Sequence, residues 1–245
     1  MDKRRFIAVF FVFTAVFFVF TAVFFVFISC TDVVFAEPII RVGVSEGVAG
    51  WVDPSEGSIS GSLSSLYKCV FEKSGLQPQY VSTPLKRGLY DLEKGRLDAL
   101  IPLARTPDRD RSLVFAGELI RSEYVYVSFK SLPDISDTIS LRFCIVRGSV
   151  GDVFVPESAS QVEEVNRWSQ LVPMLERGRV DVSVIPSMLV EEVLGQRSKE
   201  AFVQKAGALS TSMYISPFHE LTNISFRIMS SVDACRPEEG RLSRR

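Results

Sequence analysis

From residue 37 onward, short apolar runs alternate with stretches in which apolar side chains recur every three or four positions. The apolar runs predict buried strands at 39–44, 79–81, 99–101, 123–129, 141–146 and 213–215. The stretches with a period of three or four predict helices at about 62–73, after Pro84, at 189–194 and at about 222–231. Strands that alternate with amphipathic helices predict an α/β fold with mainly parallel sheets.

One short pattern occurs twice in this part of the chain. Residues 92–98 read LEKGRLD and residues 175–181 read LERGRVD, and each copy leads into an apolar run that ends in proline. The glycine suits a helix end, where the chain turns left-handed before it enters a strand. Because the copies lie 83 residues apart, too far for a solenoid repeat, the pattern predicts two similar lobes.

The first 36 residues have a different composition. Three basic residues at positions 3–5 precede a 24-residue apolar run at 6–29, in which the heptad FTAVFFV occurs twice. This arrangement predicts a secretory signal cleaved after Ala36. The run is also long enough to stay as an uncleaved anchor, and Cys30 could be a lipidated cysteine. All three alternatives place the rest of the chain outside the cytoplasm, in the periplasm.

Charge and composition exclude several functions. Beyond residue 36 the chain has 25 basic and 27 acidic side chains, and this near-neutral balance argues against nucleic acid as a partner, which calls for a clustered basic surface. It has a single histidine, His219, and no CxxC spacing, so we expect no metal and no cofactor. With one histidine, no catalytic Cys–His or Ser–His–Asp set stands out, and we expect a protein that is not an enzyme.

Three cysteines remain outside the export segment, which permits one disulfide in an oxidising compartment. Cys69 lies on the apolar side of the helix at 62–73, so we expect it to be a buried small hydrophobe. We therefore expect Cys144 and Cys235 to be the pair.

The order of these elements resembles the family 3 extracellular solute-binding proteins of bacteria, which have the type II periplasmic-binding fold. The resemblance runs from about Ile39 to Arg236. The matching motifs are Ile40-Arg-Val-Gly-Val44, Gly57 with Gly61, the Gly-Arg-Leu-Asp98 turn, Thr106-Pro-Asp-Arg109, Leu113-Val-Phe-Ala116, Arg147-Gly-Ser149 and the Gly-Arg-Val-Asp181 turn.

The resemblance implies two lobes that close on a small solute. Lobe 1 would comprise residues 37–122 and 205–245, and lobe 2 residues 123–204. Such a protein is expected to be a monomer that serves the membrane subunits of an ABC importer. Two alternatives keep the fold: a sensory ligand-binding protein that acts on a membrane receptor, and a secreted enzyme with a cleft carboxylate as general acid.

By the same resemblance Arg109 pairs with a ligand carboxylate, a role that suits the guanidinium fork. An ordinary surface arginine is the alternative, since Arg105 and Arg111 lie nearby. Trp51 would lie against the ligand or pack onto its own lobe, and Glu46 in the same loop would face the cleft or water. From lobe 2, the loop with Gly148 and Ser149 would contribute to the ligand site. From lobe 1, Arg105 would be a second cation beside Arg109.

The chain departs from the amino-acid-binding pattern at four positions. Pro102 and Ala104 stand where amino-acid binders usually have Ser or Thr, and Pro186 lies near their aspartate for the ligand ammonium. Val150 replaces a usual hydroxyl. Because a buried ammonium without an anion is costly, we expect an anion that lacks an amino group, such as a carboxylate. Trp168 is expected in the core.

Overall fold

The computed structural model describes residues 37–55, 57–135 and 140–237, which belong to one compact unit. The predicted cleavage site at Ala36, the lipidation site at Cys30 and the apolar run lie outside the described residues. Within the described part, no helix has the length and apolar character needed to cross a membrane.

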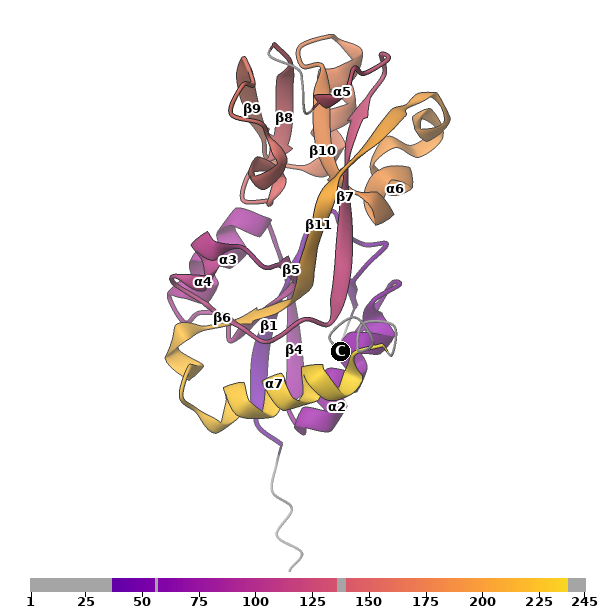
Figure 1. Cartoon of the computed structure of the whole chain (residues 1–245). Helices are drawn as coiled ribbons and strands as arrows, with labels where there is room; N and C mark the ends of the chain where they lie inside the picture. Colours follow the sequence, from indigo (N-terminus) through magenta and orange to yellow (C-terminus); the bar gives the residue numbers. More distant parts are fainter. Residues whose placement is uncertain (1–36, 56, 136–139, 238–245) are drawn as a thin grey trace, which may run out of the picture. The chain divides into compact units, whose positions relative to one another are not determined.

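Lobe 1 is built on three parallel strands that alternate with helices (Figure 1). β1 pairs with β4 on one side and with β5 on the other, and both pairings are parallel. The hairpin formed by β2 and β3 lies in the loop after β1, where the sequence predicted only a loop. The elements are β1 (Ile39–Ser45), β2 (Asp53–Ser55), β3 (Ser58–Ser60), α2 (Ser64–Ser74), β4 (Gln77–Thr83), α3 (Leu85–Glu93), β5 (Ala99–Ala104), α4 (Pro107–Asp110) and β6 (Val114–Phe115).

Lobe 2 repeats this arrangement with shorter helices. β8 pairs in parallel with β9 and with β10. The elements are β8 (Arg142–Val146), η2 (Gly151–Phe154), β9 (Gln161–Val165), η3 (Trp168–Gln170), α5 (Leu171–Glu176), β10 (Val182–Pro186), η4 (Ser187–Leu189), α6 (Val190–Leu194) and η5 (Gly195–Glu200).

Two long antiparallel strands, β7 (Ile120–Ser128) and β11 (Phe202–Ile215), connect the lobes (Figure 1). β11 pairs with β5 of lobe 1, and β7 pairs with β10 of lobe 2, so one sheet runs in the order β4-β1-β5-β11-β7-β10-β8-β9. The chain then returns through η6 (Pro217–His219) to α7 (Asn223–Cys235), which packs against α2. The sequence predicted only the last three residues of β11, because its first part is partly exposed and carries no apolar run.

The repeated turn has the same contacts in both lobes. In lobe 1, Asp98 accepts hydrogen bonds from the backbone N–H and the guanidinium of Arg41 at the start of β1. In lobe 2, Asp181 accepts the same set from Arg142 at the start of β8. Gly95 and Gly178 have positive φ angles of 67° and 60°, as the turn requires. Each copy therefore fastens a helix end to the strand that opens its lobe.

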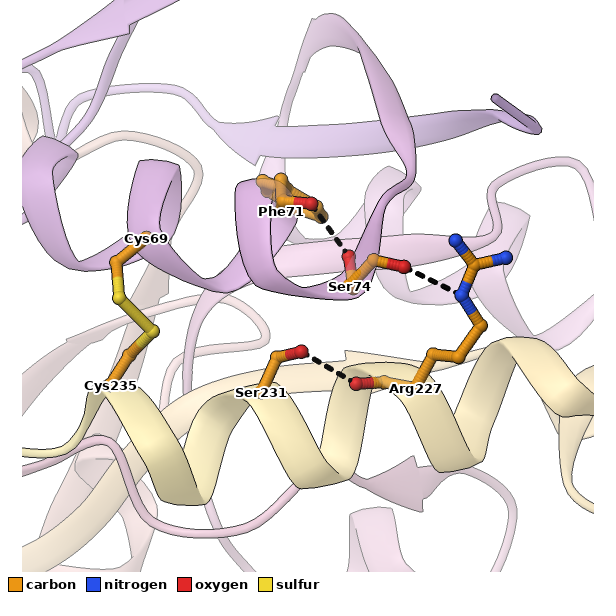
Figure 2. Close-up of a disulfide and its surroundings, with 6 residues drawn as sticks. All are labelled: Cys69, Phe71, Ser74, Arg227, Ser231 and Cys235. Carbon is orange, nitrogen blue, oxygen red and sulfur yellow. Dashed lines mark hydrogen bonds between the residues drawn. A yellow bond between two sulfur atoms is a disulfide. The ribbon is translucent and has the colours of Figure 1, made fainter. Parts of the chain in front are cut away.

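The predicted disulfide is wrong. The bond joins Cys69 on α2 to Cys235 on α7, with a Cα–Cα distance of 6.0 Å (Figure 2). Cys144 is a free thiol, fully buried on β8. The apolar side of α2 covers the sheet as its pattern predicts, but it also faces α7, and no local pattern shows this helix pairing. Arg227 of α7 strengthens the same contact by donating to the carbonyls of Ser74 and Gly75.

Candidate functional site

A small cavity of about 40 Å³ lies between the lobes, where the carboxyl ends of β1 and β5 meet the loop after β8 and the end of β10. Ligands of open α/β sheets gather at this edge of the strands. Its lining residues are Ser45, Val48, Trp51, Leu85, Pro102, Leu103, Ala104, Arg109, Tyr124, Ser149, Val150, Trp168, Pro186 and Leu189. We refer to it as the inner cavity.

Arg109 is the only charged side chain among these lining residues. It lies on the short helix α4, which begins at Thr106, and the Thr106 hydroxyl accepts a hydrogen bond from the Arg109 backbone N–H. Within the described part of the chain, the guanidinium has no ion pair. It donates to the carbonyl of Ala104 at 2.5 Å and, across the cleft, to that of Gly148 at 2.8 Å. Burial lowers the pKa of Arg109, although an arginine remains protonated in proteins.

Of the eight buried polar side-chain atoms without a partner in the described part of the chain, two belong to residues that line the inner cavity. Ser45 Oγ and Trp51 Nε1 are buried, each in a residue only 5% exposed, and neither has a hydrogen-bond partner among the described residues. Each of these two atoms has lost its bonds to water without replacement, and a ligand in the inner cavity would restore them. The indole N–H can only donate, so it calls for an acceptor.

The inner cavity has no acidic lining residue among those the structure describes. The residues that replace the usual polar groups, Pro102, Ala104, Val150 and Pro186, all line it. A positive charge entering this cavity would meet Arg109 and no anion. The electrostatics therefore favour a negatively charged or acceptor-rich ligand.

A second cavity of about 340 Å³ lies beside the first and shares Leu85 and Trp168 with it. Its lining is more polar and includes Glu46, Asn166, Arg167, Ser169 and Glu192. We refer to it as the outer cavity. A ligand held in the inner cavity by one end would have room for its other end in this more polar outer cavity.

Contacts across the cleft hold the two lobes together at both cavities. The backbone N–H of Gly50 donates to Glu192 Oε2 at 3.0 Å. Trp168 lies over Gly47, where a Cβ atom would come within 2.8 Å of its ring. Gly148 lies against the backbone of Lys86 in the first turn of α3. With these contacts in place, the cleft between the two lobes is closed.

No protein-family model and no curated protein matches the sequence. Solved structures match the fold. The sensor domain of a histidine kinase with similarity to periplasmic binding proteins aligns with a TM-score of 0.70 at 14% identity, over 85% of this chain and 94% of that one. The substrate-binding protein of an amino acid ABC transporter aligns with a TM-score of 0.67 at 16% identity, over 84% and 96%. Holo ArgBP from T. maritima aligns with a TM-score of 0.67 at 18% identity, over 87% and 98%.

The chain has the two-lobed, type II periplasmic-binding-protein-like fold. The fold class predicted from the sequence is confirmed. At 14–18% identity the likeness concerns the fold, so the ligand has to be argued from this protein's own residues.

The periplasmic-binding-protein-like fold brings most of the predicted site residues together. Arg109, Trp51 and Ser149 line the inner cavity, Gly148 binds Arg109 through its carbonyl, and Glu46 lines the outer cavity. The Ser149 hydroxyl accepts a hydrogen bond from the Gly151 N–H within its own loop.

Arg105 is not among the lining residues of either cavity. It is exposed, its Nε donates to Asp110 Oδ2 at 2.8 Å, and its guanidinium lies over the ring of Phe115.

Three residues with polar atoms are among the lining residues that the sequence missed. Ser45 closes the first strand, and its place at the carboxyl end of that strand was a usable signal. Tyr124 lies within β7, and its apolar surroundings predict a strand but not a cavity wall. Trp168 is buried, as expected of a core residue, yet it lines both cavities.

Proposed function

We propose that this protein binds a small carboxylate-bearing solute outside the cytoplasm, without catalysis, between two closing lobes. The proposed lobes are 37–122 with 205–245, and 123–204, so that the chain crosses between them inside β7 and β11. The observation that carries the proposal is the Arg109 guanidinium, which has no ion pair in the described structure and lines a cavity without acids.

The donors around the inner cavity favour a ligand rich in acceptors. Arg109 and Trp51 Nε1 can only donate, and Ser45 Oγ can donate or accept. A carboxylate on Arg109 with a second oxygen near Trp51 would satisfy them, as in a keto acid or a dicarboxylate. An α-amino acid would bring an ammonium group to a cavity that offers no carboxylate.

The size of the inner cavity supports binding coupled to lobe movement. About 40 Å³ suffices for one or two waters and is small for a whole solute. The lobes therefore have to open for entry, and the bound ligand would extend toward the outer cavity. Closure around a ligand is the ordinary motion of such two-lobed proteins.

Delivery to an ABC importer is the proposed role, supported by the fold shared with the substrate-binding protein of an amino acid ABC transporter. The sensory alternative is supported by the fold shared with a histidine kinase sensor domain. An enzyme is the weakest of the three proposals. His219 Nε2 lies 2.9 Å from Asp98 Oδ1 at the repeated turn, and it is not among the lining residues of either cavity.

The extracytoplasmic location rests on the export pattern of residues 1–36 and gains support from the disulfide. The Cys69–Cys235 bond is typical of proteins that fold in an oxidising compartment.

A thermal-shift panel tests the ligand class. Keto acids, dicarboxylates, sugars and α-amino acids are each added to the purified protein. A ligand at 100 times its Kd stabilises the folded state by about 2.7 kcal/mol. We expect stabilisation by one of the carboxylates, its loss in Arg109→Ala, and its retention in the matched control Arg105→Ala. Strong stabilisation by ordinary α-amino acids, or an unchanged affinity in Arg109→Ala, would contradict the proposal.

A further inference from the structure

Tyr124 lies where the two lobes join. It belongs to β7, and its partners across the sheet are Pro186 on β10 and Gly207 on β11 (Figure 1). Its side chain is only 5% exposed and lines the inner cavity. Its hydroxyl forms no hydrogen bond with any residue that the structure describes. Tyr124 therefore joins Ser45 and Trp51 as a residue of this cavity whose polar atom has no partner in the described structure.

The hydroxyl of Tyr124 is a hydrogen-bond donor in the field of Arg109. Burial raises the pKa of Tyr124 to about 12, and the positive charge of Arg109 acts in the opposite direction. The phenol therefore stays protonated at neutral pH and can donate. Arg109 gives one N–H to the carbonyl of Ala104 and one to that of Gly148, and its other N–H groups remain for a ligand.

The donors of the inner cavity exceed what the carboxylate of a ligand can accept. A carboxylate has two oxygens with about four lone-pair positions, and the fork of Arg109 takes one position on each oxygen. The remaining two positions face Tyr124, Trp51 and Ser45, each of which carries an N–H or O–H. An oxygen on the carbon next to the carboxylate supplies the missing acceptor. A keto oxygen suits this place better than a hydroxyl, because it brings no donor of its own.

Phe154 holds the ring of Tyr124 in place. The two rings stack with their centroids 4.9 Å apart and an angle of 27° between their planes. Phe154 is the last residue of η2, and its ring lies on Gly207, where a Cβ atom would come within 2.5 Å of it. Glycine inside a strand often marks a close approach of this kind. The carbonyl of Phe154 also accepts a hydrogen bond from the Tyr126 hydroxyl. Contacts with β7 and β11 thus fix the side chain that supports Tyr124.

From these observations we propose that Tyr124 determines the specificity of the ligand site, because its hydroxyl donates to the keto oxygen of an α-keto acid whose carboxylate lies on Arg109. Phe154 is a positioning residue, since it acts on the ligand only through the ring of Tyr124. This inference rests on the proposed function and narrows its carboxylates to α-keto acids. A ligand without the keto oxygen leaves buried donors unpaired, and a site built to form hydrogen bonds discriminates against such a ligand.

Matched pairs of acids test the proposal. The members of each pair differ only in the keto oxygen: pyruvate and propionate, α-ketoisovalerate and isovalerate, α-ketoglutarate and glutarate, phenylpyruvate and phenylpropionate. Calorimetric titration of the purified protein gives the Kd of each acid. We expect the parent to prefer a keto acid over its partner, and Tyr124→Phe to lose about fivefold of that preference, as for one hydrogen bond. The control Tyr80→Phe removes a hydroxyl that lines neither cavity and should keep the preference.

Phe154→Leu and Gly207→Ala test the support of the ring. Both should reduce the preference for the keto acid, while the affinity for its plain partner, which depends on Arg109, changes little. A general loosening of the fold would weaken both members of a pair equally, so the ratio of the two Kd values separates positioning from loss of structure.

Three results would overturn the proposal: equal Kd values within every pair in the parent, an unchanged preference in Tyr124→Phe, or no binding of any of the keto acids. Arg109→Ala tells this failure from that of the proposed function. If plain carboxylates bind and Arg109→Ala abolishes their binding, the carboxylate site stands without the keto-acid specificity. If carboxylate binding is the same in Arg109→Ala as in the parent, both proposals fail.

Discussion

Asp181 accepts three hydrogen bonds from a single residue, Arg142: one from its backbone N–H, one from Nε and one from the terminal guanidinium nitrogen. Asp98 holds Arg41 in the same way in the other lobe. The duplicated turn in the sequence is thus a duplicated clamp between a helix end and the strand that opens each lobe.

The two clamps predict a loss of stability in acid. The hydrogen bond from Arg142 lowers the pKa of Asp181. At Asp98 burial acts in the opposite direction, yet the hydrogen bonds from His219 and Arg41 lower its pKa as well. Carboxylates with lowered pKa values stabilise the fold fully above their unfolded pKa of about 3.9, and the stabilisation is lost as the pH falls through the lower folded value.

We therefore expect Asp98→Asn and Asp181→Asn to lower the free energy of unfolding at pH 7 and to flatten its decline below pH 4. Urea denaturation at a series of pH values measures both effects. Asp108→Asn is the control, since Asp108 pairs with Arg111 in the open, where ion pairs contribute little. An equal effect of all three substitutions would contradict the role of the clamps.

The disulfide predicts that the bonded cysteines and the free Cys144 behave differently. Removing the Cys69–Cys235 bond with the double variant Cys69→Ala/Cys235→Ala should cost about 2–4 kcal/mol of stability, because the bond closes a loop between residues 166 positions apart. Burial raises the pKa of Cys144 to about 11, so this thiol should resist alkylation until the protein unfolds. Peptide mapping without reductant checks the pairing, and rapid alkylation of native Cys144 would be the contrary result.

The hydroxyl of Ser45 predicts a change in binding without a cost in stability. Ser45→Ala removes a buried oxygen that has no partner in the described structure, so the ligand-free protein should be as stable as the parent or slightly more stable. Affinity for the carboxylate should fall by roughly tenfold if the hydroxyl binds the ligand.

Ser183→Ala is the matched control, because Ser183 is also buried and without a partner but does not line the inner cavity. Calorimetric titration and thermal melts of both variants separate the two effects. If both variants changed affinity alike, Ser45 would have no particular part in binding.

The contact between Gly50 and Glu192 predicts a kinetic effect. Glu192→Ala removes the acceptor of a hydrogen bond that crosses the cleft, and Glu192→Gln keeps an acceptor there. We expect the alanine variant to release ligand several-fold faster, since a hydrogen bond contributes about 1 kcal/mol to the closed state. Stopped-flow dissociation measures the rate, and equal rates in the parent and Glu192→Ala would show that the contact does not hold the lobes closed.

The sequence by itself determined the alternation of strands and helices in lobe 1, the duplicated turn and the α/β fold class, because burial leaves a periodic trace along each of these elements. The family resemblance singled out Arg109, which lies on α4 after its Thr106 cap and lines the inner cavity. Only the tertiary structure decided that α2 lies against α7, which pairs Cys69 with Cys235 and leaves Cys144 free in the core. It likewise brought Trp168 to the cavities and left Arg105 outside them. A hydrophobic pattern records that a side chain is buried, but the neighbour that buries it is chosen when distant segments pack together.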